Sequence, residues 1–291
     1  VAVSTNLSGW ILKMGVYAPE KVTNYERRPD SLSDWRQGPE GQHIELGISE
    51  MNLFMMLGMF GLSTDLIGQQ LIPIGTVYDP FVLRGLESLI YSLYSGARFI
   101  FAGTPSGISL STEGGAHQST INPSIGIGIP NLRAVEPCFA QEMEWIMLEA
   151  LHDCCDQENG RTTYLRLSTK PIDQTLLEPA LKRLGEQELR RQVISGGYRL
   201  VDWRDVGPAR QDDRLVHIAT SGAMVPEAVK AANLLMEEGI PVNVLNLTSP
   251  RSLFEKWQGQ NSGQRSNLPD SQSDPFDDLI PTSERRAPIV T

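Results

Sequence analysis

The strongest constraint on the fold of this chain is an alternation of short apolar runs with longer helical patterns. Residues 71–78 and 98–103 read as short buried strands, and a helical pattern spans residues 81–94 between them. A further helical pattern covers residues 136–151, and another strand follows at residues 162–168. This alternation predicts an α/β fold with a doubly wound, mostly parallel sheet.

Two segments that precede this pattern also predict secondary structure. Residues 1–5 read as a strand-like run, which predicts that the chain begins inside a domain whose first helix is missing. Residues 51–62 are apolar on every side at helical length, so we expect a helix that is buried all round. The N-terminus of that helix should then point into the interior.

The pattern also predicts two domains. We expect a first domain over residues 1–205 and the start of a second over residues 206–291. Residues 215–247 predict one strand–helix–strand unit of this second domain. Residues 258–286 are rich in Ser, Gln, Asp and Pro, which indicates a long flexible loop. Residues 288–291 read as the start of a further strand, so the second domain is expected to be incomplete.

Composition excludes several classes of partner. The formal net charge of −10 disfavours binding to nucleic acid or to an anionic membrane, because both would be repelled. The longest apolar stretch, residues 51–62, is about half of a membrane span. The three cysteines, Cys138, Cys154 and Cys155, lack the spacing of a metal site or a disulfide framework and are expected to be reduced. We therefore expect a cytoplasmic protein.

Three features fall at strand ends and helix starts of the first domain, where α/β sheets bind ligands. Glu50 stands at the start of the apolar helix, where it either caps the helix or meets a ligand, because a buried unpaired carboxylate is costly. His117 lies in a glycine-containing loop and is either a surface residue or an imidazole presented to a cleft. Tyr78 and Phe81 follow a strand end, where they either pack in the core or line a pocket.

The order of these features resembles the thiamine-diphosphate superfamily of 2-oxoacid dehydrogenases and transketolases. The pyrimidine-binding domain of that superfamily has a Gly-Ile-x-Glu turn, an aromatic residue after the next strand, and a histidine in a glycine loop. Residues 47–50, Phe81 and His117 stand in this order. The resemblance covers most of the chain and is closest to the homodimeric decarboxylating component of the pyruvate dehydrogenase complex, which shares the Glu-Gly-x-x-His form of residues 113–117.

Two positions depart from the transketolases. Thr169 stands where transketolases have an arginine that binds a sugar phosphate, and Pro105 replaces a histidine that binds their substrate. The resemblance therefore favours a 2-oxoacid over a sugar phosphate.

The resemblance also implies roles for four residues. Glu50 would hydrogen-bond the ring nitrogen of the aminopyrimidine and favour the imino tautomer that removes the thiazolium proton. Phe81 would stack on the pyrimidine, and Tyr78 would line the same pocket. His117 would exchange a proton with the substrate carbonyl or with the hydroxyalkyl intermediate.

No Gly-Asp-Gly sequence occurs, although the superfamily uses that motif to bind magnesium and diphosphate. The resemblance implies that the diphosphate and Mg²⁺ are held by a diphosphate-binding domain outside this chain, contributed by a second protomer of a homodimer. The chain is then a fragment of a longer polypeptide or a separate subunit, with no metal ligands of its own. Alone, it is expected to be inactive.

The function implied is thiamine-diphosphate-dependent oxidative decarboxylation of a short 2-oxoacid, with acyl transfer to a lipoyl carrier on a partner acyltransferase component. Pyruvate is the leading substrate, and 2-oxobutyrate is equally compatible with the sequence. Two alternatives stay open: a transketolase-like transferase, and a structural or regulatory module without catalysis of its own.

Overall fold

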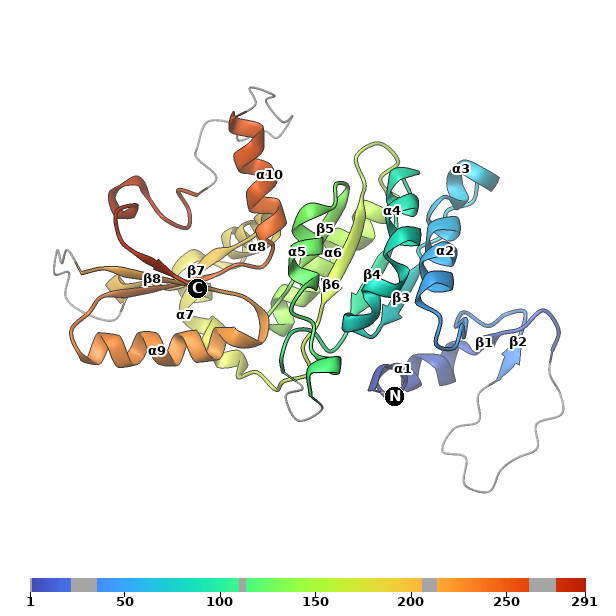
Figure 1. Cartoon of the computed structure of the whole chain (residues 1–291), viewed down its shortest axis with the longest axis horizontal. Coiled ribbons are helices and arrows are strands. Elements are labelled where there is room, and N and C mark those ends of the chain that lie inside the picture. Colours follow the sequence, from blue (N-terminus) through green and yellow to red (C-terminus); the bar gives the residue numbers. More distant parts are fainter. Residues whose placement is uncertain (1, 22–35, 110–113, 206–213, 262–275) are drawn as a thin grey trace, which may run out of the picture.

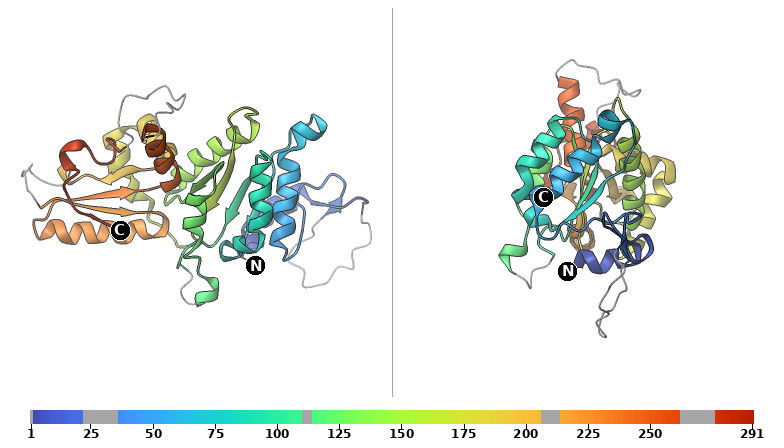
Figure 2. Two further views of the ribbon diagram at one scale, coloured as in Figure 1. Left: turned by 45° about the horizontal axis from the view of Figure 1, so that its top comes forward. Right: turned by 90° about the vertical axis from the view of Figure 1, so that its right-hand side faces the viewer.

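The computed structural model describes residues 2–21, 36–109, 114–205, 214–261 and 276–291. These residues include two four-stranded sheets that lie one after the other along the long axis of the molecule, each flanked by helices (Figures 1 and 2). A parallel pair of two-residue strands, β1 (Val16–Tyr17) and β2 (Gln37–Gly38), lies near the N-terminus. The predicted α/β class with mostly parallel strands is confirmed.

The first sheet has four parallel strands in the order β3-β4-β6-β5. They are β3 (Ile74–Val77), β4 (Ile100–Gly103), β5 (Leu132–Val135) and β6 (Thr162–Arg166). Its helices are α2 (Glu50–Gly61), α3 (Ser63–Ile67), α4 (Leu86–Tyr94), α5 (Asn122–Gly128) and α6 (Ala140–Cys155), with the 3₁₀ helix η1 (Asp79–Gly85) before α4.

Alternation along the strands explains why helices cover both faces of this sheet. Phe99 and Phe101 point to one face, where they pack in a cluster with Phe54 of α2. Ile100 points to the other face and packs with Trp145 of α6. Successive strand residues point to opposite sides, so a strand that is apolar throughout needs a helix on each side.

The second sheet has the strand order β10-β8-β9-β7, in which only β7 is antiparallel among the strands described. Its strands are β7 (Tyr198–Val201), β8 (Val216–Thr220), β9 (Val242–Asn246) and β10 (Ile289–Val290). Its helices are α7 (Glu178–Leu184), α8 (Glu186–Ser195), α9 (Val225–Glu237) and α10 (Pro250–Asn261), with the 3₁₀ helix η6 (Gly222–Met224) before α9. The β8-α9-β9 unit is the predicted strand–helix–strand. Because β7 precedes residue 206, the second sheet begins within the range expected for the first domain.

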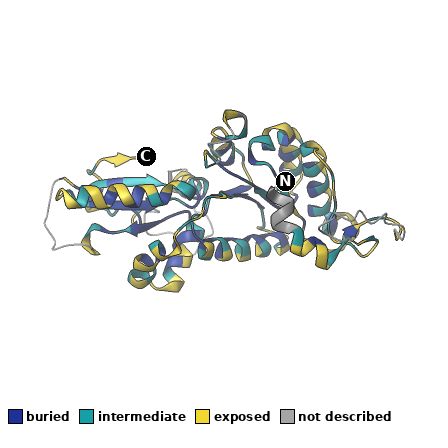
Figure 3. Cartoon of the chain, turned by 90° about the horizontal axis from the view of Figure 1, so that it is seen from below, coloured by how far each residue is buried: buried dark blue, intermediate teal, exposed yellow. Residues whose placement is uncertain are grey.

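Three local expectations were wrong. Residues 2–14 form helix α1 (Ala2–Met14) rather than a strand; the helix buries Ile11 and stops before Gly15, whose φ is +75°. Helix α2 is not buried all round, because only one of its sides faces the sheet (Figure 3). Part of the loop expected over 258–286 is regular, since α10 continues to Asn261 and a 3₁₀ turn spans Thr282–Glu284. The remainder of that expectation, residues 262–275, lies outside the described residues.

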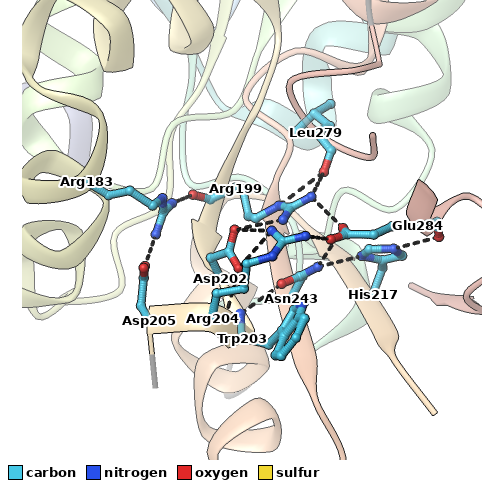
Figure 4. A network of polar contacts seen from close by, with 10 residues as sticks. All are labelled: Arg183, Arg199, Asp202, Trp203, Arg204, Asp205, His217, Asn243, Leu279 and Glu284. Carbon is cyan, nitrogen blue, oxygen red and sulfur yellow. Dashed lines mark hydrogen bonds and ion pairs between the residues drawn. The ribbon is translucent and has the colours of Figure 1, made fainter. Parts of the chain in front are cut away.

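A polar network holds the segment after residue 276 against the second sheet (Figure 4). Arg199 pairs with Asp202 and with Glu284, each at 2.8 Å. His217 Nε2 lies 3.3 Å from the Glu284 carbonyl oxygen, and Asn243 Nδ2 lies 3.3 Å from His217 Nδ1. Burial lowers the pKa of His217, which favours its neutral form in this network. No helix among the described residues has the length and apolar character needed to cross a membrane.

The two sheets are joined through the buried carboxylate of Glu142 on α6. Its Oε1 accepts hydrogen bonds from the Tyr198 hydroxyl at 2.6 Å and from Asn246 Nδ2 at 2.7 Å. Its Oε2 accepts from the backbone amides of Cys138 and Phe139 at 2.7 and 3.0 Å. Burial raises the pKa of Glu142, and the hydrogen bonds from Tyr198, Phe139 and Cys138 offset only part of that rise. One carboxylate thus connects α6 of the first sheet with β7 and β9 of the second.

We expect Glu142→Ala to lower the free energy of unfolding by about 3 kcal/mol, because three buried donors and one partly buried donor lose their acceptor. Tyr198→Phe removes one donor and should cost about 1 kcal/mol. Urea denaturation of both variants measures the difference. Equal losses in the two variants would contradict a central role for the carboxylate.

Candidate active site

The predicted site residues lie at the carboxyl edge of the first sheet. Tyr78 directly follows β3, and the loop that carries His117 follows β4. The strands of this sheet are parallel, so their carboxyl ends meet at one edge, which is where such sheets bind ligands. Helix α2 precedes β3 in the chain, and its first residue, Glu50, is brought to the same edge.

A series of contacts connects all four predicted residues. The Tyr78 hydroxyl lies 2.9 Å from His117 Nδ1. The rings of Tyr78 and Phe81 have centroids 5.3 Å apart. The Arg84 guanidinium carbon lies 4.1 Å from the centroid of the Phe81 ring, and Arg84 Nη1 lies 4.0 Å from Glu50 Oε2. The structure therefore brings Glu50, Phe81, Tyr78 and His117 together, and their roles remain predictions.

The close approach of η1 to α2 depends on Gly85. A Cβ atom at this position would lie 2.4 Å from a ring carbon of Phe54 and 2.7 Å from the Glu50 carbonyl oxygen. Only a residue without a side chain lets η1 pack this tightly against the first turn of α2. Gly85 thereby sets the spacing between Glu50 and Phe81, the two residues predicted to hold the pyrimidine.

The Glu50 carboxylate points from α2 toward η1, where it pairs with Arg84. Its side chain is 13% exposed and its ion-pair partner, Arg84, belongs to η1. The preceding Ser49 is the N-cap residue and makes no capping bond through its side chain. The start of α2 also favours a negative charge, because the helix dipole is positive there.

Arg84 shows what kind of group fits between Glu50 and Phe81. Its guanidinium, a flat group with N–H donors, lies over the Phe81 ring and faces the Glu50 carboxylate. An aminopyrimidine is also flat and also offers N–H donors. The Arg84 side chain is 58% exposed, so rotation into solvent would leave this place to a ligand.

A buried network beside these residues was missed in the sequence. The Asp79 side chain is fully buried, and its carboxylate accepts hydrogen bonds from Ser119 Oγ and the Tyr164 hydroxyl. Asn122 Nδ2 donates to the Asp79 carbonyl, and Arg166 Nε lies 3.6 Å from Asp79 Oδ2. The available signal was one charged residue at each of two predicted strands: Asp79 directly after residues 71–78, and Arg166 within residues 162–168.

The network borders a cavity of about 1110 Å³ between the two sheets. Glu136 lies at its edge, and burial raises the pKa of Glu136, whereas Arg166 lowers it and Asp79 raises it. The four predicted residues do not line this cavity. Its lining includes Ser106, Ser119, Glu136 and Arg166 on one side and Ile218, Ala219 and Ala228 on the other. Among the described residues, no group of three or more His, Cys, Asp or Glu is placed to bind a metal ion.

No protein-family model matches the sequence. The chain is 22% identical over 268 residues to the pyruvate dehydrogenase E1 component of Pseudomonas aeruginosa, a match that covers 89% of this chain and 29% of that protein. It is 26% identical over 229 residues to a 6-deoxy-6-sulfo-D-fructose transketolase subunit of a Clostridium species, covering 78% of this chain and 61% of that subunit. The chain thus spans less than two thirds of either relative.

Solved transketolases share the fold. The transketolase of Leishmania mexicana matches 74% of this chain and 28% of its own, with a TM-score of 0.55 and 24% identity. A split-gene transketolase, described as an inactive beta4 tetramer, matches 89% of this chain and 74% of its own, with a TM-score of 0.52 and 20% identity. The resemblance to the thiamine-diphosphate superfamily is thereby confirmed; these identities do not separate the dehydrogenase from the transketolase branch.

We expect Gly85→Ala to lower the free energy of unfolding by about 1–3 kcal/mol, because the new methyl group overlaps Phe54 and the Glu50 carbonyl. The backbone of Gly85 has φ −104° and permits alanine, so the loss reports packing alone. Gly128→Ala is the control: a Cβ there meets nothing within 4 Å and should change stability by less than about 0.5 kcal/mol. Urea denaturation compares them, and a neutral Gly85→Ala would contradict the close packing of η1 on α2.

Proposed function

We propose that this chain is the pyrimidine-binding part of a thiamine-diphosphate enzyme that oxidatively decarboxylates a short 2-oxoacid, with pyruvate as the leading substrate. The acyl group would pass to a lipoyl carrier on a partner acyltransferase component. The observation that carries the proposal is the placement of the Glu50 carboxylate and the Phe81 ring around one flat, N–H-bearing group. That is the arrangement an aminopyrimidine requires.

Each residue has a defined task in this proposal. Glu50 holds a proton between its carboxylate and the pyrimidine nitrogen, at a helix start that is mostly shielded from water. Phe81 supplies an aromatic face, and Tyr78 packs beside it. Bound thiamine diphosphate supplies the electron sink for decarboxylation.

His117 would handle the proton on the substrate side. Its Nδ1 lies 2.9 Å from the Tyr78 hydroxyl. A hydroxyl that donates to Nδ1 leaves the ring proton on Nε2, so Tyr78 would fix both the orientation and the tautomer of the imidazole. An oriented imidazole is the usual general acid or base near neutral pH.

The exposed side of α2 and α4 supports a partner domain over the site. Apolar side chains gather there at unusual exposure: Met51 44%, Met55 55%, Met59 59%, Tyr91 65% and Tyr94 88%. Methionine and tyrosine are enriched at the cores of protein interfaces, and exposed apolar patches of this kind mark interaction surfaces. The occupant we propose is the diphosphate-binding domain of a second protomer, which would bring Mg²⁺ and the diphosphate site.

Arg166 bears on the choice between 2-oxoacid and sugar phosphate. It stands at the carboxyl end of β6, but it is 3% exposed and pairs with both Glu136 and Asp79. A guanidinium held in this way does not offer itself to a substrate phosphate. The transketolase-like alternative is supported by the similarity to a transketolase subunit. Turnover of sugar phosphates, and none of 2-oxoacids, by the complete enzyme would establish it.

For the complete enzyme that contains this chain, we expect Glu50→Gln and His117→Ala to separate two steps. Glu50→Gln cannot share a proton with the pyrimidine, so exchange of the thiazolium proton should slow. His117→Ala should retain that exchange while decarboxylation or acyl transfer falls about 100-fold or more. Deuterium exchange at the thiazolium carbon, followed by acid quench and NMR, is compared with steady-state turnover.

Two results would count against these roles. Equal loss of exchange in both variants would show that His117 orders the cofactor instead of acting on the substrate. Normal exchange in Glu50→Gln would remove the proposed function, because that function depends chiefly on this residue.

A further inference from the structure

Three charged side chains are packed between the candidate site and the second domain. Arg166 pairs with Glu136 through Nη1, and its Nε lies 3.6 Å from Asp79 Oδ2. Asp79 is fully buried, Arg166 is 3% exposed, and the Glu136 side chain is 20% exposed. Buried ion pairs contribute little net stability, because desolvation offsets their attraction. This cluster, unlike the buried pair of Arg133 and Asp153, lies at the carboxyl edge of the sheet, where parallel sheets bind ligands.

The cluster holds the loop of His117 through two groups of Ser119, its hydroxyl and its backbone carbonyl. Ser119, two residues after His117, donates through its hydroxyl to Asp79 and accepts at its carbonyl from Arg166 Nη2 at 3.3 Å. Asp79 directly follows Tyr78, whose hydroxyl contacts His117 Nδ1. Residues 78 and 79 thus contact residues 117 and 119 pairwise, which fixes the direction of the loop as well as its distance.

Glu136 connects the same cluster to the second domain. A Cβ atom at Gly222, the first residue of η6, would lie 2.7 Å from Glu136 Oε1 and 2.8 Å from its Cγ. The Glu136 carboxylate therefore packs directly on the backbone that leads into α9. The Glu136 amide also donates to the Thr248 carbonyl at 2.8 Å, just after β9. A shift of the second domain must move Glu136, and with it Arg166.

We propose that Asp79 and Arg166 are positioning residues for His117, and that Glu136 makes this positioning depend on the second domain. The inference rests on the proposed role of His117 as the group that handles the substrate proton. The second domain would then influence the chemistry through Glu136, Arg166 and Ser119 without touching the substrate.

The first test uses the full chain and ¹⁵N NMR of the His117 imidazole, which reports the ratio of its two tautomers. Tyr78→Phe gives the reference change in this tautomer ratio, because it removes the hydroxyl that contacts His117 Nδ1. We expect Asp79→Asn, Arg166→Gln and Glu136→Ala each to change the ratio by about fivefold, the effect of weakening one hydrogen bond. Glu136→Gln keeps an acceptor for Arg166 and should restore most of the wild-type ratio.

Arg133→Gln is the matched control. Arg133 is another buried arginine of the first sheet, but it pairs with Asp153 at 3.0 Å and with Glu149 at 3.5 Å on α6. It should lower stability and leave the His117 ratio unchanged. An equal change in Arg133→Gln would show general loosening and overturn the proposal. So would an unchanged ratio in all network variants when Tyr78→Phe alters it.

The second test uses the complete enzyme. Glu136→Ala should lower kcat about tenfold and shift the pH profile of kcat, while thiazolium exchange and thiamine-diphosphate affinity stay at wild-type levels; Glu136→Gln should recover kcat. Unchanged kcat and pH profile in Glu136→Ala would overturn the positioning role. Failure of the proposed function would give a different result from failure of this positioning role. It would appear as normal exchange of the thiazolium proton in Glu50→Gln, and the tautomer ratio of His117 would not affect that result.

Discussion

The buried carboxylate of Asp79 is the interaction on which the rest of the candidate site depends. Asp79 lies two residues after β3 and begins η1, and its carboxylate accepts hydrogen bonds from the loop after β4 and from Tyr164 of β6. A Cβ at Gly103, the last residue of β4, would lie 2.1 Å from Asp79 Oδ1, so the neighbouring strand must end in glycine to admit the carboxylate. One anion thus connects three strands, and Tyr78, directly before it, and Phe81, two residues after it, take their places accordingly.

The sequence predicts helices and strands well where one spacing of apolar residues dominates a segment. It predicts them poorly where contacts between residues far apart in the chain determine the structure. The alternation after residue 71 gave β3, α4, β4, α6 and β6, because apolar strands covered by helices on both faces leave a simple pattern. Residues 1–5 were misread as a strand because their alternating β-branched residues resemble one, whereas residues 2–14 form a helix that buries Ile11. Helix α10 (Pro250–Asn261) was not predicted, and its last residues fall in a segment whose polar composition resembles a loop.

The same contrast holds for the site. Glu50, Phe81, Tyr78 and His117 could be selected from their order along the chain, and the structure connects them in one series of contacts that runs through Arg84. The network of Asp79, Arg166 and Glu136 could not be selected, because its meaning comes from three strand ends that meet only in the folded sheet. A lone aspartate or arginine near a strand end is compatible with a surface position. Only its burial shows that it has partners.

The exposed methionine side of α2 links the error about that helix to its proposed function. A helix that is apolar all round needs cover on two sides, and the described residues cover only the side that carries Phe54 and Leu57. The uncovered side of α2 begins beside Glu50. In the proposed function, this is where the domain that binds the diphosphate would meet the domain that binds the pyrimidine. If a partner domain covers this side, that domain also excludes water from the Glu50 carboxylate and from the place beside the Phe81 ring. Docking and cofactor activation would then be one event, with Arg84 leaving its place between Glu50 and Phe81 as the pyrimidine enters.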